Sequence, residues 1–92
     1  MPQDAVERET VRETVRTFIL KEFLPGEDPD LLTDTTSLIR GGILDSISST
    51  RLISHLEDTF GVQFSQKEVR VENLDNIESI VGLVGAKLNT HP

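Results

Sequence analysis

The sequence predicts an all-α fold, a small four-helix bundle of three main helices and one short helix, with a long loop between the first two. Two observations predict this fold. Apolar residues recur at helical spacing in three separate segments, and residues typical of helix starts precede them. The polar residues 25–44, which include prolines and glycines, separate the first two segments. We expect a single domain over residues 1–92, ordered over about residues 4–88 with short tails.

The first helix is predicted to begin at Asp4, which has Glu7 at capping-box spacing, and to end near Phe23, shortly before Pro25. Its apolar face is expected to consist of Val11, Val15, Phe18 and Ile19. A second ridge is basic and alternates with glutamates; it consists of Arg8, Arg12 and Arg16. This charge pattern indicates a solvated face.

Residues 25–44 form an unusually long connection for a compact domain. A loop of this length is typically functional or anchored to the core. The expected anchors are the apolar residues Leu31, Leu32, Leu38 and Ile39. A short helical turn is expected at residues 30–33.

The second helix is predicted over residues 45–60, with Asp45 as its N-cap. Its buried stripe is expected to consist of Leu52, Ile53, Leu56 and Phe60. Gly61 is suited to the left-handed position that ends a helix, and Val62 can then pack against the core.

Two further pairs with capping-box spacing follow, and each predicts a helix start. Ser65 with Glu68 indicates a short helical turn, and Asp75 with Glu78 indicates the last helix. The apolar stripe of that helix is Ile77, Ile80, Val81, Val84 and Leu88. Two glycines inside it, Gly82 and Gly85, each cost roughly 1 kcal/mol relative to alanine, for which close helix packing is one hypothesis. The tail from residue 89 is expected to fray.

The composition excludes several classes of function. The formal net charge of −7 argues against nucleic acid or an anionic membrane as partner and favours a partner with a basic docking surface. Cysteine is absent, which excludes disulfides, thiolate metal sites and a cysteine nucleophile. No apolar run approaches the roughly 18 residues of a membrane span, and the N-terminus lacks signal-peptide features. We therefore expect a cytoplasmic protein without membrane insertion.

Ser46 is the residue to which the sequence draws most attention. It lies in the first turn of the second helix, where unpaired amides and the helix dipole favour a phosphate group. Gly41 and Gly42 let the preceding chain approach closely and turn sharply into the helix. The simpler interpretation is that a serine at a helix start only caps the helix, although Asp45 already fills that role.

A hydrolytic or metal-dependent function is disfavoured. A serine nucleophile needs a base, and the histidines are His55 and His91. His55 lies nine residues along the same helix, about 13 Å from Ser46 at 1.5 Å per residue, and His91 lies in the tail. His55 also lacks a second ligand with metal-site spacing. We therefore expect neither catalytic residues nor a metal site.

The segment around Ser46 resembles the attachment motif of the acyl carrier and peptidyl carrier protein family, free-standing type. The residues that carry this resemblance are Gly42, Ile43, Leu44, Asp45, Ser46 and Ile47, followed by Leu52, Leu56, Phe60, Gly61 and Val62. The order of helices over nearly the whole chain matches as well. The resemblance implies that a phosphopantetheinyl transferase attaches 4′-phosphopantetheine from coenzyme A to Ser46, with Asp45 as motif residue and N-cap. Acyl or aminoacyl groups would then be carried as thioesters on the arm of this phosphoprotein, which is itself no enzyme.

The resemblance also implies a docking face along the second helix. Its expected partner-binding residues are Ile47, Ser48, Thr50, Arg51, Ser54, His55 and Asp58. Fatty-acid carriers are usually acidic along this face, whereas Ser48 and Arg51 stand here where acid is common. This departure favours specialised biosynthesis of polyketides, nonribosomal peptides or related antibiotics, although surface charges also drift without functional meaning.

The same family resemblance implies several partners and leaves several alternatives open. The expected partners are the transferase, a loading enzyme (an acyltransferase or an adenylation enzyme) and downstream synthase or tailoring enzymes, acting on a monomer. The alternatives within the family are a D-alanyl or a fatty-acid carrier protein. An alternative of a different class is a small helical protein-interaction module without a prosthetic group.

Overall fold

The computed structural model describes the backbone of residues 2–89 and the side chains of residues 8–88. Four α-helices and one 3-10 helix follow one another in the order α1 (Pro2–Phe23), η1 (Pro29–Leu31), α2 (Ser46–Phe60), α3 (Val71–Leu74) and α4 (Ile77–Asn89). No strand occurs within residues 2–89. The predicted all-α fold, with three main helices, one short helix and a long first loop, is confirmed. In the described part of the chain, every helix is too short or too polar to cross a lipid bilayer.

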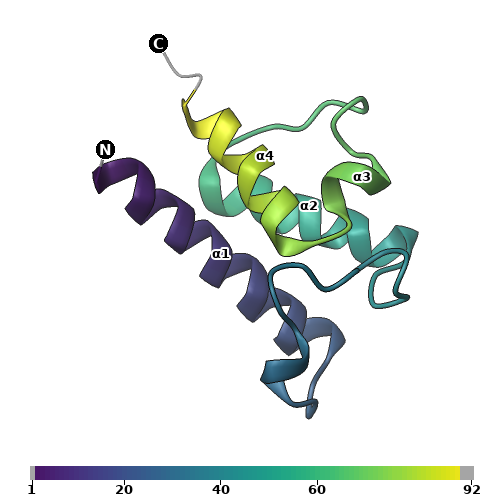
Figure 1. Cartoon of the computed structure of the whole chain (residues 1–92). Helices are drawn as coiled ribbons and strands as arrows, with labels where there is room; N and C mark the ends of the chain where they lie inside the picture. Colours follow the sequence, from purple (N-terminus) through teal and green to yellow (C-terminus); the bar gives the residue numbers. More distant parts are fainter. Residues whose placement is uncertain (1, 90–92) are drawn as a thin grey trace.

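The helices pack around one apolar core. In Figure 1, α4 lies between α1 and α3, and α2 passes behind it. Helix α1 contacts both α4 and α2, and α3 packs against α4. The core residues of the helices are Val11, Val15, Ile19, Leu52, Ile53, Leu56, Leu74, Ile77, Ile80, Val81 and Val84. Burial of each such side chain contributes about 1.5–3 kcal/mol relative to leaving it exposed, so the core is the main source of stability.

Helix α2 matches its predicted bounds closely, whereas the starts of α1 and α4 differ from prediction. Asp45 is the N-cap of α2, and Gly61 ends the helix at φ 66°, with its amide donating to the carbonyl of Glu57 (2.9 Å). Helix α1 begins at Pro2 rather than at Asp4. The side chains of the predicted capping box at residues 4 and 7 lie outside the described residues, as does the tail beyond residue 89.

The predicted cap of the last helix is wrong by one residue. Helix α4 begins at Ile77, and the side-chain oxygen of Asn76 accepts a hydrogen bond from the amide of Ser79 (2.7 Å). Asp75 instead ends α3, and its carboxylate points back to the long loop. The segment that begins at Ser65 is a turn, in which the Ser65 amide donates to Glu68 (2.8 Å), and the short helix starts later, at Val71.

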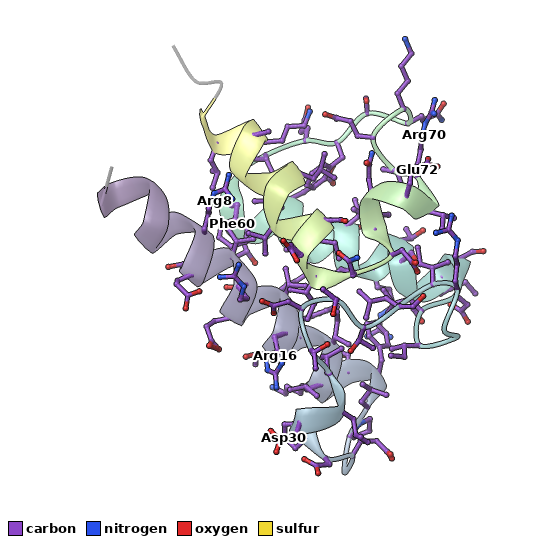
Figure 2. All side chains as sticks on the ribbon, viewed as in Figure 1. Arg8, Arg16, Asp30, Phe60, Arg70 and Glu72 are labelled. Carbon is purple, nitrogen blue, oxygen red and sulfur yellow. The ribbon has the colours of Figure 1, made fainter. Side chains whose placement is uncertain are left out.

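The long loop is anchored to the core, and α1 contributes to the anchoring. Leu32 and Leu38 are buried as predicted, whereas Leu31 is 67% exposed, so its predicted role as an anchor is wrong. The guanidinium group of Arg16 donates to the carbonyl oxygens of Pro29 (2.7 Å) and Leu32. Figure 2 shows Arg16 directed from α1 toward the segment that carries Asp30.

The basic ridge of α1 is therefore not the solvated face that its pattern predicted. Besides the contacts of Arg16, the Nε atom of Arg12 lies 2.9 Å from the carboxylate of Asp34 in the loop. Arg12 also pairs with Glu9 within the helix. Two of the three arginines thus fix the path of the chain between α1 and α2.

The two glycines of α4 do not mark close helix packing. A Cβ atom added to Gly82 or Gly85 would meet no heavy atom of a neighbouring element within 4 Å. The hypothesis of close packing is therefore wrong, and nothing in the structure explains why glycine stands at these positions.

Candidate functional site

Ser46 is the first residue of α2, and its side chain is exposed. The preceding residue, Asp45, has an extended backbone, and its carboxylate accepts a hydrogen bond from the amide of Ser48 (2.8 Å). This hydrogen bond is the main cause that lowers the pKa of Asp45. Because Asp45 satisfies the cap, the Ser46 hydroxyl is left available at the surface.

The sharp entry into α2 depends on two glycines, as the sequence predicted. A Cβ atom at Gly41 would lie 2.2 Å from the carbonyl oxygen of Ser37, which no side chain can tolerate. Gly42 has a φ of +85°, in the left-handed region that favours glycine. The two glycines therefore let the loop close on itself directly before the serine.

Residues 37–44 form a closed turn that positions the head of α2. The carbonyl oxygen of Leu38 accepts hydrogen bonds from the amides of Ile43 and Leu44, both at 2.8 Å. Leu38 and Leu44 are both buried in the core. Asp45 and Ser46 follow directly, so the serine is held at the end of a hydrogen-bonded and buried support.

Asp75 fastens this turn to the corner between α3 and α4. Its carboxylate accepts hydrogen bonds from the hydroxyl of Ser37 (3.0 and 3.1 Å) and from the amides of Ile39 and Arg40 (both 2.9 Å). The hydrogen bond from the Arg40 amide is the largest cause that lowers the pKa of Asp75. The sequence reasoning missed this role, because no local spacing connects Asp75 with backbone amides 35 and 36 residues earlier.

An open groove of about 630 Å³ lies beside Ser46. The loop and the head of α2 form one side of it, and the segment around α3 forms the other. The lining residues are Ile39, Gly42, Leu44, Asp45, Ser46, Ser49, Thr50, Val69, Arg70, Val71 and Leu74. Figure 2 shows Arg70 and Glu72 at the edge of the molecule near α3, far from α1. The groove offers an apolar surface within reach of a group attached to the serine.

The predicted partner-binding residues divide into two sets. Ile47 is 73% exposed, and further exposed residues of α2 follow it at helical spacing. The exposed set comprises Ile47, Thr50, Ser54 and Asp58, with half-buried Ser48 beside them. The second set, Arg51 and His55, contacts α1.

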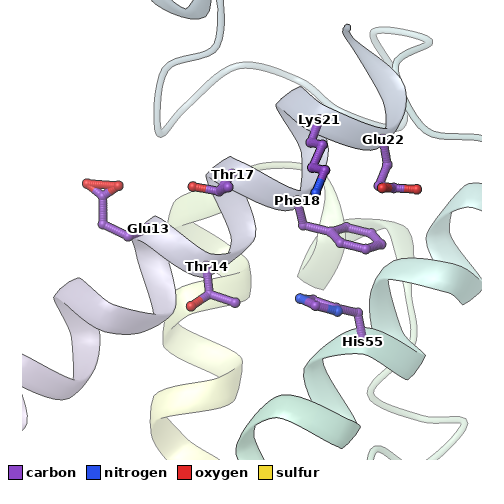
Figure 3. Close-up of a pocket in the computed structure, with 7 residues that line it drawn as sticks. All are labelled: Glu13, Thr14, Thr17, Phe18, Lys21, Glu22 and His55. Carbon is purple, nitrogen blue, oxygen red and sulfur yellow. The ribbon is translucent and has the colours of Figure 1, made fainter.

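Arg51 and His55 are engaged in contacts within the chain. Arg51 pairs with Glu22 (2.7 Å), and its guanidinium carbon lies 5.3 Å from the ring centroid of Phe23. The imidazole of His55 stacks on Phe18, as Figure 3 shows, within a shallow pocket between α1 and α2. These contacts join α2 to α1, so that Arg51 and His55 each have one side against α1.

The structure assembles no catalytic or metal centre around Ser46 within its described residues. His55 is held against Phe18 and lies two turns and more along the helix from the serine. Among residues with described side chains, no group of three or more His, Asp or Glu is placed to hold a metal ion. The site thus presents an exposed hydroxyl on the first turn of α2, beside a groove with an apolar lining.

Comparison with known proteins identifies the family. A family model described as "Phosphopantetheine attachment site" matches residues 9–84, which is most of the chain. The chain therefore belongs to this family of carrier domains, whose members bear a covalent 4′-phosphopantetheine on a serine. No curated protein matches the chain closely enough to be reported as a relative.

Proposed function

We propose that this chain is an acyl carrier protein whose Ser46 bears the 4′-phosphopantetheine arm. Acyl or aminoacyl groups would be carried on the arm as thioesters in polyketide, nonribosomal peptide or related specialised biosynthesis in the cytoplasm. The observation that supports this most is the exposed Ser46 hydroxyl at the first position of α2, inside the segment that the family model matches.

The residues around Ser46 suit a phosphodiester. In the attachment reaction the Ser46 oxygen would bond to the phosphorus of coenzyme A that bears the pantetheine. The pyrophosphate bond to the nucleotide would break, and a base of the transferase would take the hydroxyl proton. The first-turn amides of α2 would then stabilise the phosphate charge by about 0.3–1 kcal/mol. The arm supplies the thiol that the cysteine-free chain lacks.

The groove beside Ser46 gives the carried group a place to be sheltered from water. Its apolar lining includes Ile39, Leu44 and Leu74, and Ser46 itself is among the lining residues. A group that folds back from the arm would bury apolar surface there at about 25 cal/mol per Å². The thioester would then be released to partner enzymes when the group leaves the groove.

The proposed docking face is the exposed set of Ile47, Thr50, Ser54 and Asp58, with Ser48 beside them. Ile47 is the largest exposed apolar side chain of α2 and adjoins Ser46, so it is suited to insert into a pocket on a partner. Arg51 and His55 would contribute the faces that their contacts with α1 leave open. The transferase, a loading acyltransferase or adenylation enzyme, and downstream synthase or tailoring enzymes would share this face.

Intact mass spectrometry tests the attachment directly. The protein is incubated with coenzyme A, magnesium and a phosphopantetheinyl transferase of broad specificity, beside an established carrier protein as positive control. We expect the gain of one phosphopantetheine, its loss in Ser46→Ala, and its retention in the matched variant Ser49→Ala. An unchanged mass beside a modified positive control would instead support an interaction module without a prosthetic group.

The pathway is tested by loading the modified protein. The modified protein is incubated with a panel of adenylation enzymes and their amino acids, or with a panel of acyltransferases and their acyl-coenzyme A substrates. The acylated protein is detected by its mass. We expect loading by enzymes of specialised biosynthesis and poor loading by fatty-acid enzymes, because Ser48 and Arg51 stand where those carriers are acidic. Efficient loading by the fatty-acid enzymes would contradict the proposed pathway class and leave the attachment to Ser46 intact.

A further inference from the structure

Asp75 directs its carboxylate to the loop rather than to a helix end. The side chain is 15% exposed, and Oδ1 accepts three hydrogen bonds, from Ser37 Oγ (3.0 Å), the Ile39 amide (2.9 Å) and the Arg40 amide (2.9 Å). Oδ2 accepts from Ser37 Oγ (3.1 Å) and faces the Arg40 guanidinium group at 3.5 Å. Helix α4 does not need this carboxylate, because Asn76 supplies its cap.

The backbone of Asp75 reinforces the same contact. Its carbonyl oxygen accepts a hydrogen bond from the amide of Leu38 (2.5 Å), and the Glu78 amide donates to the carbonyl of Asp34 (3.0 Å). From Leu38 the connection continues through its own carbonyl oxygen to the amides of Ile43 and Leu44. Only Asp45 separates Leu44 from Ser46, so this set of hydrogen bonds connects Asp75 to the head of α2.

Asp75 also spans the two sides of the groove beside Ser46. Its carboxylate holds the amide of Ile39, which lines the loop side, and its chain neighbour Leu74 lines the α3 side. Loss of the carboxylate would leave the part-buried amide of Ile39 without its acceptor and free the two sides to separate. Asp75 therefore connects the loop that carries Ser46 with the α3 side of the groove.

We propose that Asp75 is a positioning residue for phosphopantetheine transfer to Ser46, acting through residues 37–44 without touching the serine. This inference rests on the proposed function. Without the carboxylate, the loop would populate conformations in which the transferase cannot engage Ser46. If the competent fraction falls to about a tenth, the apparent KM for the carrier rises about tenfold while kcat is unchanged.

Four variants separate positioning from general stability. Asp75→Ala removes every side-chain acceptor, whereas Asp75→Asn keeps one oxygen for the amides of Ile39 and Arg40. Ser37→Ala removes a single donor. Val84→Ala is the matched control, because Val84 is fully buried in α4 and is not part of the hydrogen-bonded loop contact, so its loss weakens the core alone.

The experiment measures kcat and KM of modification by the same transferase, at a temperature where circular dichroism shows every variant folded. We expect KM to rise about tenfold in Asp75→Ala, less in Asp75→Asn and Ser37→Ala, and by no more than about twofold in Val84→Ala. Equal KM values for Asp75→Ala and Val84→Ala would overturn the proposal.

A spectroscopic measurement separates this proposal from the attachment function itself. Amide resonances of residues 41–48 are compared between wild type, Asp75→Ala and Val84→Ala by two-dimensional NMR. We expect Asp75→Ala to shift or broaden them and Val84→Ala to leave them in place. If wild type is not modified but the resonances shift in Asp75→Ala alone, the attachment function fails while the role of Asp75 in the loop stands. Unshifted resonances in Asp75→Ala would overturn the role of Asp75 itself.

Discussion

The imidazole ring of His55 lies stacked on the phenyl ring of Phe18, with centroids 4.2 Å apart and an interplanar angle of 16°. Phe18 in turn meets the edge of Phe23 at 5.6 Å. This row of rings joins α1 to α2 near the surface, as Figure 3 shows for Phe18 and His55. His55 is thereby a structural contact of α2 in addition to a candidate docking residue.

Replacement of His55 separates these two roles. We expect His55→Ala to lower the free energy of unfolding by about 1 kcal/mol, because an aromatic pair contributes about 0.5–1.5 kcal/mol beyond its buried area. The KM for Ser46 modification should also rise, because His55 contributes to the face on which the transferase is proposed to dock. Urea unfolding and the transferase assay measure the two effects, with the exposed neighbour Ser54→Ala as control for stability. Unchanged modification beside lowered stability would make His55 a structural contact alone.

Because Arg16 holds the loop, we expect its removal to lower the stability of the fold. Arg16→Ala takes charged donors from the carbonyls of Pro29 and Leu32, and we expect it to lower the free energy of unfolding by about 2 kcal/mol. Urea unfolding measures the change. Arg8→Ala, on the same ridge and exposed, is the matched control and should cost less than about 0.5 kcal/mol. Equal effects of the two variants would show that the loop contact adds no stability.

The open space around Gly82 predicts a stabilising substitution. Because an added Cβ meets nothing within 4 Å, Gly82→Ala should raise the free energy of unfolding by about 1 kcal/mol. The melting temperature should rise by about 4–8 °C for a domain of this size. Gly41→Ala is the opposite case, since its Cβ would collide with the Ser37 carbonyl, and we expect a lower melting temperature. Calorimetry of both variants checks the contrast.

The carboxylates of the loop and of the α2 cap predict a loss of stability in acid. Folding lowers the pKa values of Asp45 and Asp75 through hydrogen bonds from backbone amides, and that of Glu68 through Lys87. A lowered folded-state pKa stabilises the fold above the unfolded value of about 4, and this contribution is lost as pH falls through the folded pKa.

Comparison with one variant isolates the contribution of Asp75 to this pH dependence. We expect wild type to be more stable than Asp75→Asn at pH 7, and the difference to shrink as the pH falls below about 4. Urea unfolding of both proteins across this range measures it. A difference that stays constant with pH would mean that the charge of Asp75 plays no part.

Local signals in the sequence were sufficient to predict the helices and the position of Ser46. The aspartate cap, the ending at Gly61 and the apolar stripe of α2 all depend on neighbours within a few residues, so spacing reveals them. The close approach at Gly41 was predicted as well, although the atom that it meets was not. Docking residues on α2 stay a prediction.

The contacts that hold the long loop could not be predicted from spacing. Arg16 and Asp75 bind backbone carbonyl and amide groups. Because nearly all residues have these groups, the sequence does not show which of them a side chain contacts. These backbone partners lie 13 to 36 residues away along the chain. Asp75 was also misassigned because Glu78 stands three residues later, a spacing that equally suits a helix cap.

The pairing of Ser37 with Asp75, 38 residues apart, has a consequence for the order of events during synthesis. Ser46 leaves the ribosome before Asp75 does, so the turn that supports the serine cannot be fastened to the corner between α3 and α4 until that corner has emerged. Such distant contacts form late, because a long stretch of chain must be ordered first. In a nascent chain that ends before residue 75, the loop that carries Ser46 would lack its contact with the corner between α3 and α4.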